Sequence, residues 1–379
     1  MKFFHLSDLH IGLRLYEHSM LEEQEYILNT IIDHAKQEQI DGVLIAGDIY
    51  DKSIPPASAT VLFDSFLTRL ADLNIAVYMI AGNHDSAERV SFGSELMRRR
   101  GVFISRPYEG AVTPITLRDS YGELDLYLLP YLRPSDVRDA HAECEAITFH
   151  DAVGYAISQL PVRADVRNVI LTHQFLLGAS LGGGEETVSV GGTDAVGVDV
   201  YEPFDYVAAG HIHSPQSVTR PTVRYSGTPL AYSFSENAFK KSLTVVELKE
   251  KGSVEITELP LVPRRPLLTL EGRFEDLISP EFRAGVNTDA FYEIHLCDGE
   301  LVLDASLLLS KFYPNLLFLT NKIRSDADRY EISEVEDKRP IEYLEELYRM
   351  QNGAELDEVG RAVLVEILDE VWGDMQCDR

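Results

Sequence analysis

The chain has 379 residues, of which 45% are hydrophobic and 25% charged, so it is long enough for two domains with a sizeable core. Its formal net charge of −28 argues against non-specific binding of nucleic acid, although divalent cations at a carboxylate-rich site would reverse the local field. The three cysteines lie far apart and indicate neither a disulfide framework nor a zinc ribbon. No apolar run could span a membrane and the N-terminus turns polar too soon for a signal peptide, so we expect a cytoplasmic protein without a membrane partner.

Short β-rich apolar runs recur in the first half of the chain. They are Phe3–Leu6, Val43–Ala46, Ile75–Ile80, Leu124–Leu129, Val169–Leu171 and Tyr206–Ala209. Between the second and third runs, the stretch Ala57–Leu73 places Leu62, Phe66 and Leu70 on one face at helical spacing. A strand, a helix and a strand at this interval predict a largely parallel, buried sheet. In such sheets the functional residues gather beyond the carboxyl ends of the strands.

The second half of the chain changes pattern twice. Ser242–Leu261 predicts two strands joined by a turn at Lys251-Gly252, and a proline-rich linker follows. The runs Leu267–Leu270, Phe274–Ile278, Phe291–Leu296, Ala305–Phe312 and Leu316–Leu319 then alternate between strand and helix. We therefore expect a first domain over 1–262, a small α+β capping domain over 263–340 and a helical tail over 341–379. The glycine-rich stretch Gly178–Gly192 lacks the Gly-Lys-Ser/Thr of a phosphate loop and indicates a flexible loop.

Five of the six predicted strands in the first half of the chain are followed by oxygen or imidazole side chains, and none by a cysteine pair. The motifs are Ser7-Asp8-Leu9-His10, Gly47-Asp48-Ile49-Tyr50-Asp51, Gly82-Asn83-His84-Asp85, Thr172-His173 and Gly210-His211-Ile212-His213. Singly each is weak, because a lone histidine is usually a packed or surface residue and Gly-Asp is common turn chemistry. Five such motifs at the strand ends of one domain indicate a shared site.

The residue types in these motifs indicate the chemistry of that site. Carboxylates, an amide oxygen and imidazoles without thiolates suit manganese, iron or zinc. Two such metals about 3.5–4 Å apart would generate a hydroxide and clamp a phosphoryl group. A metal pair of this kind needs one bridging carboxylate on a rigid strand end, and Asp48 fits that requirement.

The order of the five motifs resembles the calcineurin-like metallophosphoesterase superfamily, which implies an α/β fold with a two-sheet sandwich. The stretches HLSDLHIGLRL, GDIYDKSIPP, AGNHDS and GHIHSPQ are more closely similar to the SbcD-type nuclease subunits of bacteria. These subunits are in turn similar to the double-strand-break repair nucleases of archaea and eukaryotes. The resemblance extends through the capping domain and so covers most of the chain.

The resemblance implies a role for each motif residue. Asp8, His10 and His213 would hold one divalent metal, Asn83, His173 and His211 the other, and Asp48 would bridge both. His84 would face the substrate, stabilising charge on the phosphorus or protonating the leaving oxygen. Asp85 would fix the tautomer of His84, and both are therefore predicted catalytic residues. We expect Asp51 to orient the site rather than to bind a metal.

The function implied by the resemblance is Mn²⁺-dependent hydrolysis of DNA phosphodiester bonds. It comprises 3′-to-5′ exonuclease action on duplex ends and endonuclease action on hairpins or single strands, in DNA repair, recombination and replication at the nucleoid. Lys52-Ser53 after Gly-Asp-x-x-Asp counts against a protein phosphatase. Two alternatives stay open: a stand-alone phosphodiesterase for nucleotides or cyclic nucleotides, and a non-catalytic scaffold. The scaffold is the least favoured, because all seven ligand positions are filled.

Three features bear on partners. Phe63 and Leu67 form a second apolar patch on Ala57–Leu73, which would either pair two subunits as a homodimer or pack within the domain. Two acidic helices in the tail each carry an apolar stripe, which would either dock on an SbcC-type, SMC-like ATPase or fold back on the capping domain. The basic clusters Arg98-Arg99-Arg100, Lys240-Lys241 and Arg264-Arg265 would either contact DNA or be solvated.

Overall fold

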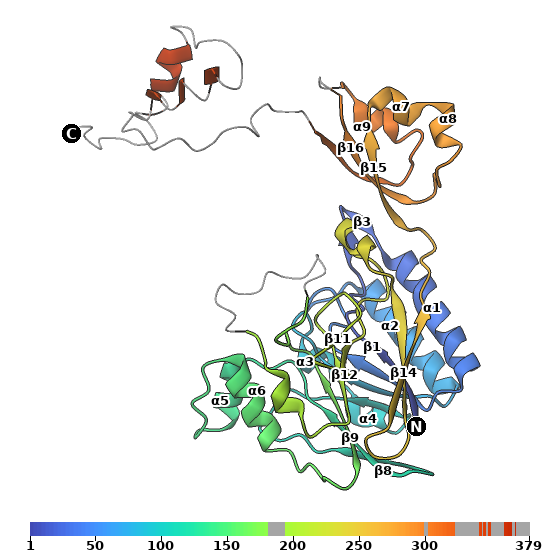
Figure 1. Ribbon diagram of the computed structural model, residues 1–379, viewed down its shortest axis with the longest axis vertical. Coiled ribbons are helices and arrows are strands. Elements are labelled where there is room, and N and C mark those ends of the chain that lie inside the picture. The colour runs from blue at the N-terminus through green and yellow to red at the C-terminus, as the bar shows by residue number, and fades with distance from the viewer. Residues whose placement is uncertain are drawn as a thin grey trace, which may run out of the picture.

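The computed structural model describes residues 1–180, 194–298 and 302–322, and of the tail 341–342, 344–345, 348–349, 360–365 and 368. Its larger part is a sandwich of two six-stranded sheets, with the smaller capping domain beyond it (Figure 1). Between the sheets lies a core that joins Phe3, Leu44 and Tyr78 of one sheet to Leu126, Val169 and Tyr206 of the other. The expected two-sheet α/β sandwich is thus confirmed.

The first sheet has the order β14-β13-β1-β4-β5-β6. Strands β1 (Lys2–Leu6), β4 (Gly42–Ala46), β5 (Ala76–Ile80) and β6 (Val102–Ile104) are parallel, whereas β13 (Ser242–Leu248) and β14 (Val254–Pro260) are antiparallel additions. Helices α1 (Leu21–Glu38) and α2 (Ala57–Asp72) cover its outer face. They do so because Ile31 and Phe66 pack against Phe4, Val43 and Val77 of the strands.

The second sheet has the order β11-β12-β10-β9-β8-β7. Its strands are β7 (Ile115–Asp119), β8 (Gly122–Leu128), β9 (Arg167–Thr172), β10 (Tyr206–Ala209), β11 (Gln216–Val218) and β12 (Arg220–Tyr225). Its outer face is covered by α5 (Pro134–Ala140), α6 (Phe149–Ser158) and the 3₁₀ turn η1 (Val198–Tyr201). Strands β8, β9, β10 and β12 run parallel, so their carboxyl ends meet at one edge.

The capping domain has its own sheet and core. Parallel strands β15 (Leu267–Gly272), β16 (Phe291–Leu296) and β17 (Leu316–Asn321) alternate with α7 (Phe274–Ile278), α8 (Pro280–Arg283) and α9 (Ala305–Leu309). Tyr292, Ile294 and Leu309 are buried at its centre. The remaining short elements are β2 (Arg14–Leu15), β3 (His18–Ser19), α3 (Ala87–Val90), α4 (Ser94–Arg98) and η2 (Phe234–Ala238), all in the larger domain. Among the described residues, no helix is long and apolar enough to cross a membrane.

The predicted strands form within one or two residues of their expected ends. Of the two alternatives for the apolar patch on α2, packing within the domain is the one that the structure supports. Phe63 and Leu67 are buried with Phe66 and Leu70, because α2 packs against α1 as well as the sheet and so buries a wider stripe than expected. The patch is therefore part of this domain's own core. The tail falls largely outside the described residues, as does 181–193 of the predicted glycine-rich loop; the tail positions that the structure describes are helical.

Candidate metal centre

The parallel pairing of the strands brings the predicted motifs to one edge of the sandwich. The segment after β1 runs beside the segment after β4, where Asp8 N donates to the Gly47 carbonyl and His10 N to the Asp48 carbonyl, both at 3.0 Å. From the second sheet, β9 delivers His173 and β10 delivers His211. His211 N donates to Asp8 Oδ1 at 3.0 Å, which joins the two sheets at the site.

Four residues of these motifs have a strained backbone. Asp8, His10, Asp48 and His211 have positive φ angles of 53°, 43°, 49° and 106°. Residues other than glycine seldom adopt this region, and it persists where the surrounding structure enforces it. Here the strained turns direct side chains from neighbouring strand ends into one volume.

Two glycines allow the strand ends to approach closely. A Cβ atom on Gly82 would overlap the Asp48 side chain, and one on Gly210 would overlap the Ala46 carbonyl oxygen and crowd the His173 ring. The glycines of Gly-Asn-His-Asp and Gly-His-x-His are therefore required by packing at the centre.

Asp48 lies at the middle of the cluster. Within each of three groups, Asp8-His10-His213, His10-Asp48-His84 and Asp8-Asp48-His173, the potential ligand atoms lie within 4.8 Å of one another. Asp48 Oδ2 is 3.2 Å from His173 Nε2 and 3.9 Å from the Nε2 atoms of His10 and His84. Asn83 completes a further group, because its Oδ1 lies 3.0 Å from His173 Nε2 and 3.1 Å from His211 Nδ1. All seven predicted ligands are thus neighbours.

Burial shapes the protonation of the cluster. It raises the pKa of Asp8 and lowers the pKa values of His10 and His211 to about 3, so both rings are neutral. Burial alone would lower the pKa of His173, but Asp48 and Asp8 beside it raise that pKa to about 9. The same contact with His173 keeps the pKa of Asp48 below its usual range despite burial. The centre therefore favours positive charge next to its two carboxylates.

These side chains fit divalent cations. Both ring nitrogens of His10 are buried and have no hydrogen-bond partner in the described part of the chain, and a metal–nitrogen bond would satisfy one of them. Buried carboxylates such as Asp8 and Asp48 also need a counter-charge. The donors are carboxylate and amide oxygens with imidazole nitrogens, the mixture expected for a dimetal site of first-row metals.

The expected contact between Asp85 and His84 is wrong. The Asp85 carboxylate accepts hydrogen bonds from the backbone N–H groups of Gly82, Ile49 and Tyr50, at 3.0 to 3.1 Å, and so ties the segment after β5 to the segment after β4. The His84 Nδ1 atom lies 3.0 Å from the backbone carbonyl oxygen of Asp51 instead. A carbonyl can only accept, so this contact places the proton on Nδ1.

One residue of the site has no sequence signal. Glu236, in η2, is 1% exposed, and its Oε1 lies 3.0 Å from Nδ1 of His213. A carboxylate on the second ring nitrogen orients a metal-binding histidine. No motif marks Glu236, which follows His213 by 23 residues.

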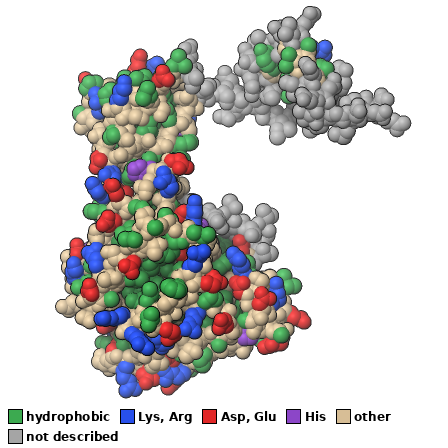
Figure 2. All heavy atoms as spheres, turned by 180° about the vertical axis from the view of Figure 1, so that it is seen from behind, with side chains coloured by type: hydrophobic (Ala, Val, Ile, Leu, Met, Phe, Trp, Pro, Cys, Tyr) green, Lys and Arg blue, Asp and Glu red, His purple; other side chains and the backbone are tan. Residues whose placement is uncertain are grey.

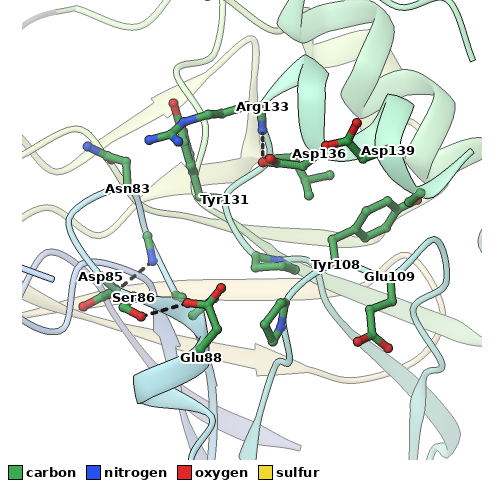
Figure 3. A pocket seen from close by; sticks show the side chains of 17 residues that line it. Asn83, Asp85, Ser86, Glu88, Tyr108, Glu109, Tyr131, Arg133, Asp136 and Asp139 are labelled. Carbon is green, nitrogen blue, oxygen red and sulfur yellow. Dashed lines mark hydrogen bonds between the residues drawn. The ribbon is translucent and has the colours of Figure 1, made fainter.

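A pocket of about 670 Å³ opens beside the cluster (Figure 3). Asn83 and Asp85 line it on the side of the centre, and the Arg133 guanidinium lies 5.9 Å from the centre of the Tyr131 ring. The remaining charged side chains of its lining are carboxylates: Glu88, Glu109, Asp136 and Asp139. The centre thus continues into a cavity with one basic side chain and several acidic ones.

This chain matches a known protein family and is similar to individual known proteins. The calcineurin-like phosphoesterase family matches residues 1–215. The SbcD subunit of the nuclease SbcCD from Staphylococcus epidermidis is 29% identical over 362 residues, which are 95% of this chain and 96% of that protein. A dimetal phosphatase from Danio rerio covers 69% of this chain and 96% of its own at 11% identity, with a TM-score of 0.42. The phosphoesterase Yfce of E. coli covers 69% and 100%, at 14% identity and a TM-score of 0.28.

Proposed function

The chain belongs to the calcineurin-like phosphoesterase family, and from this premise we propose that it is the nuclease subunit of an SbcCD-type complex. Its reaction would be hydrolysis of DNA phosphodiester bonds, as a 3′-to-5′ exonuclease on duplex ends and an endonuclease on hairpins and single strands. The similarity to a nuclease subunit over 95% of the chain supports the DNA substrate. The observation that carries the proposal is the cluster in which Asp48 stands between two groups of ligands.

We assign Asp8, His10 and His213 to one cation, Asn83, His173 and His211 to the other, and Asp48 to both. Two bound divalent cations would supply Lewis acidity at the phosphoryl oxygens and a nucleophile at neutral pH. The protein holds this geometry through strained turns and the hydrogen bonds of Asp85. We expect Mn²⁺ to be the most effective cation, because four of the seven ligands are imidazoles.

His84 is the residue that we assign to proton transfer. Its side chain is 28% exposed and its Nε2 atom lies 3.9 Å from Asp48 Oδ2, at the edge of the metal centre. Because the Asp51 carbonyl accepts the Nδ1 proton, Nε2 is the atom that can give up or take a proton. With a second proton on Nε2, as the imidazolium, it would protonate the leaving oxygen as the phosphodiester bond breaks, and the neutral ring would remain with its proton on Nδ1.

The pocket beside Asn83 would receive the part of the strand that flanks the cleaved bond. Arg133 is the basic side chain among the residues that line it and would contact a phosphate. The carboxylates of the same lining would repel a second phosphate. This distribution of charge favours a sugar and base, rather than continuous backbone, in the pocket.

In the described part of the chain, acidic side chains engage part of the basic surface that was predicted to contact DNA. Figure 2 shows basic and acidic side chains interspersed on one face of both domains. Lys241 and Arg265, which were candidates for DNA contact, form ion pairs with Glu236 and Glu23 at 2.6 and 2.7 Å. Arg98, Arg99 and Arg100 are exposed. We therefore infer that much of the affinity for DNA comes from an SbcC-type partner.

A homodimer would use other side chains than Phe63 and Leu67. Exposed apolar residues lie around α2, α3 and α4, namely Ile54, Val61, Phe92 and Leu96, and Phe92 is 82% exposed. Exposed apolar side chains gathered on one region often mark an interface. We propose that a second copy covers this region.

The experiment that tests the function is a cleavage assay with purified protein on hairpin and blunt duplex DNA, with and without an SbcC-type ATPase. We expect both substrates to be cut in Mn²⁺ and the partner to increase the rate. Cyclic nucleotides and nucleotide esters serve as parallel substrates. Hydrolysis of these small esters without cleavage of DNA would replace the proposal by the stand-alone phosphodiesterase.

A further inference from the structure

One segment of the chain contacts both the metal centre and the capping domain. This junction segment, residues 226–241, connects β12 to β13 and contains η2. Figure 1 shows the capping domain beyond the end of the larger domain where β3 lies. Of the two proposed cation positions, the junction segment lies against the one formed by Asp8, His10 and His213.

Its contacts with that cation position involve two side chains. Glu236 Oε1 lies 3.0 Å from His213 Nδ1, and the Tyr232 ring meets the His10 ring edge-on with centroids 5.9 Å apart. The second cation position is supported elsewhere, since His173 Nδ1 lies 2.7 Å from the Ala46 carbonyl oxygen. The junction segment therefore bears on one cation position more directly than on the other.

Glu236 is held rigidly. Its Oε2 atom accepts three hydrogen bonds: from Lys241 Nζ at 2.6 Å, from Thr228 Oγ1 at 3.2 Å and from the Tyr232 backbone N–H at 3.3 Å. Lys241 Nζ also donates to the backbone carbonyl of His213 at 3.0 Å. Because these groups are buried together, a shift of η2 would have to move the His213 ring or leave a buried charge without its partner.

The neighbouring residues of η2 contact the capping domain. The Asn237 side-chain amide donates to the Leu267 carbonyl oxygen of β15, an edge strand of the capping sheet. Phe234 packs beside Leu267 and Phe291, and the Tyr16 ring lies between Phe234 and Phe318, with centroids 6.1 and 4.9 Å away. Glu236 and Asn237 are consecutive residues of one turn. Glu236 thus contacts the proposed metal ligand His213, and Asn237 contacts the capping domain.

From this arrangement we propose that η2 couples the position of the capping domain to cation binding at Asp8, His10 and His213. Glu236 is the positioning residue of this coupling, and Asn237 transmits it to β15. Coupling of this kind is reciprocal. Cation binding that fixes the His213 ring stabilises the contact between η2 and β15. Conversely, displacement of the capping domain lowers the affinity for that cation. The inference rests on the metal centre proposed above.

The test is hydrogen–deuterium exchange of the full chain with and without Mn²⁺, combined with a titration that counts cations and measures their affinities. In the wild-type protein we expect Mn²⁺ to slow exchange over both Phe234–Ala238 and Leu267–Gly272. Glu236→Gln should lower the affinity for one of the two cations by about 10- to 100-fold and leave the affinity for the other unchanged. In that variant, at Mn²⁺ concentrations that fill only the unaffected position, exchange over Leu267–Gly272 should no longer respond.

A second variant separates the two halves of the coupling. Asn237→Ala should keep both cations bound and keep the protection of Phe234–Ala238, but lose the response of Leu267–Gly272. Because the coupling is reciprocal, any loss of affinity in this variant should be confined to the cation at Asp8, His10 and His213. Glu255→Gln, which removes an exposed carboxylate paired with Lys249, is the matched control and should behave as the wild type. If the wild-type protein binds two cations without any change over Leu267–Gly272, or if Asn237→Ala keeps that change, the coupling is refuted. Failure to bind any cation would instead refute the metal centre itself.

Discussion

At the scale of single residues, Asp48 is the side chain on which both proposed cation positions depend. It lies within 4 Å of His10, His84 and His173, and it accepts the His84 backbone N–H at 2.9 Å. Asp48→Ala should therefore remove both cations, as measured by elemental analysis of the purified protein. Asp51→Ala is the control and should retain both, because the contact of Asp51 with His84 is made by its backbone. Two cations in the Asp48 variant would contradict the bridging assignment.

Substitutions of His84 and Asp85 should affect different properties, the cleavage rate in one case and the melting temperature in the other. His84→Gln should lower the cleavage rate by about 10²–10⁴-fold while both cations and the melting temperature are preserved, since glutamine cannot transfer the proton. Asp85→Ala should instead lower the melting temperature, because three backbone N–H groups lose their acceptor. Calorimetry and single-turnover cleavage would measure both quantities. A His84 variant within a few-fold of the wild-type rate would make His84 a structural residue.

Only some residues of the site can be predicted from sequence motifs. That the seven proposed ligands lie together could be predicted, because strand ends in a parallel sheet place consecutive motifs at one edge. The backbone carbonyl of Asp51 at His84 and that of Ala46 at His173 could not, because any residue type offers a carbonyl. Glu236 was missed for a related reason: its contact with His213 depends on the path of a loop, which leaves no spacing rule in the sequence.

At the scale of elements, Arg167 at the start of β9 connects the two sheets. Its guanidinium is buried and donates to the Asp119 carboxylate and to the Leu248 and Lys249 carbonyls, next to the end of β13. Met1 donates its amino group to the same carboxylate at 2.7 Å. Although desolvation opposes it, hydrogen bonds from Arg167 and the N-terminus hold the pKa of Asp119 well below its usual range.

Asp119→Asn should therefore lower the free energy of unfolding by about 3 kcal/mol at neutral pH, because a buried guanidinium loses its counter-charge. A depressed carboxyl pKa stabilises the fold above the unfolded pKa of about 4, and this contribution is lost as the pH falls toward the folded pKa. The difference between the wild type and the variant should accordingly shrink below pH 4. Denaturant titrations at several pH values measure it, and a constant difference would contradict the assignment.

Elements were predictable where burial left a local pattern. Strands such as β4 and β5 are apolar on both faces, so a short run of Val, Leu and Ile identified them. Helix α1 was not identified, although Ile27, Ile31 and Ala35 on its buried face carry a helical period. The pairing of β1 with β13 could not be predicted, because strands so distant along the chain share no local signal. The buried stripe of α2 was underestimated because its contact with α1 is equally non-local.

At the scale of the whole molecule, cations should support both activity and stability. Chelation should abolish cleavage, and Mn²⁺ should restore it better than Mg²⁺, which prefers oxygen ligands and keeps its waters. Mn²⁺ at about 100 times its dissociation constant should also stabilise the fold by about 2.7 kcal/mol for each site. Thermal unfolding with each metal measures this effect. Equal rates in Mg²⁺ and Mn²⁺ would contradict the imidazole-rich ligand assignment.

The tail is the part of the molecule that we expect to bind the SbcC-type partner. Residues 326–379 carry 17 acidic and 6 basic side chains, which would favour a basic surface on the partner and speed the encounter. The sequence also repeats apolar residues at helical spacing there: Ile341, Leu344, Leu347 and Tyr348, then Leu356, Val359, Val363, Ile367 and Val371. Such a stripe on a helix suits a groove formed by a coiled coil.

Removal of the tail after Pro340 should therefore separate assembly from catalysis. In the described part of the chain, the core clusters of both domains contain no residue beyond Leu319, so the truncated protein should fold. We expect it to keep both cations and its basal cleavage of DNA while it no longer co-purifies with the SbcC-type ATPase. A full-length variant with Val359, Val363 and Ile367 changed to Ser should lose the partner in the same way, which excludes an effect of chain length. Capture of the ATPase by the truncated protein at wild-type strength would show that the docking surface lies in the two folded domains, and loss of cation binding would show that the tail packs against them.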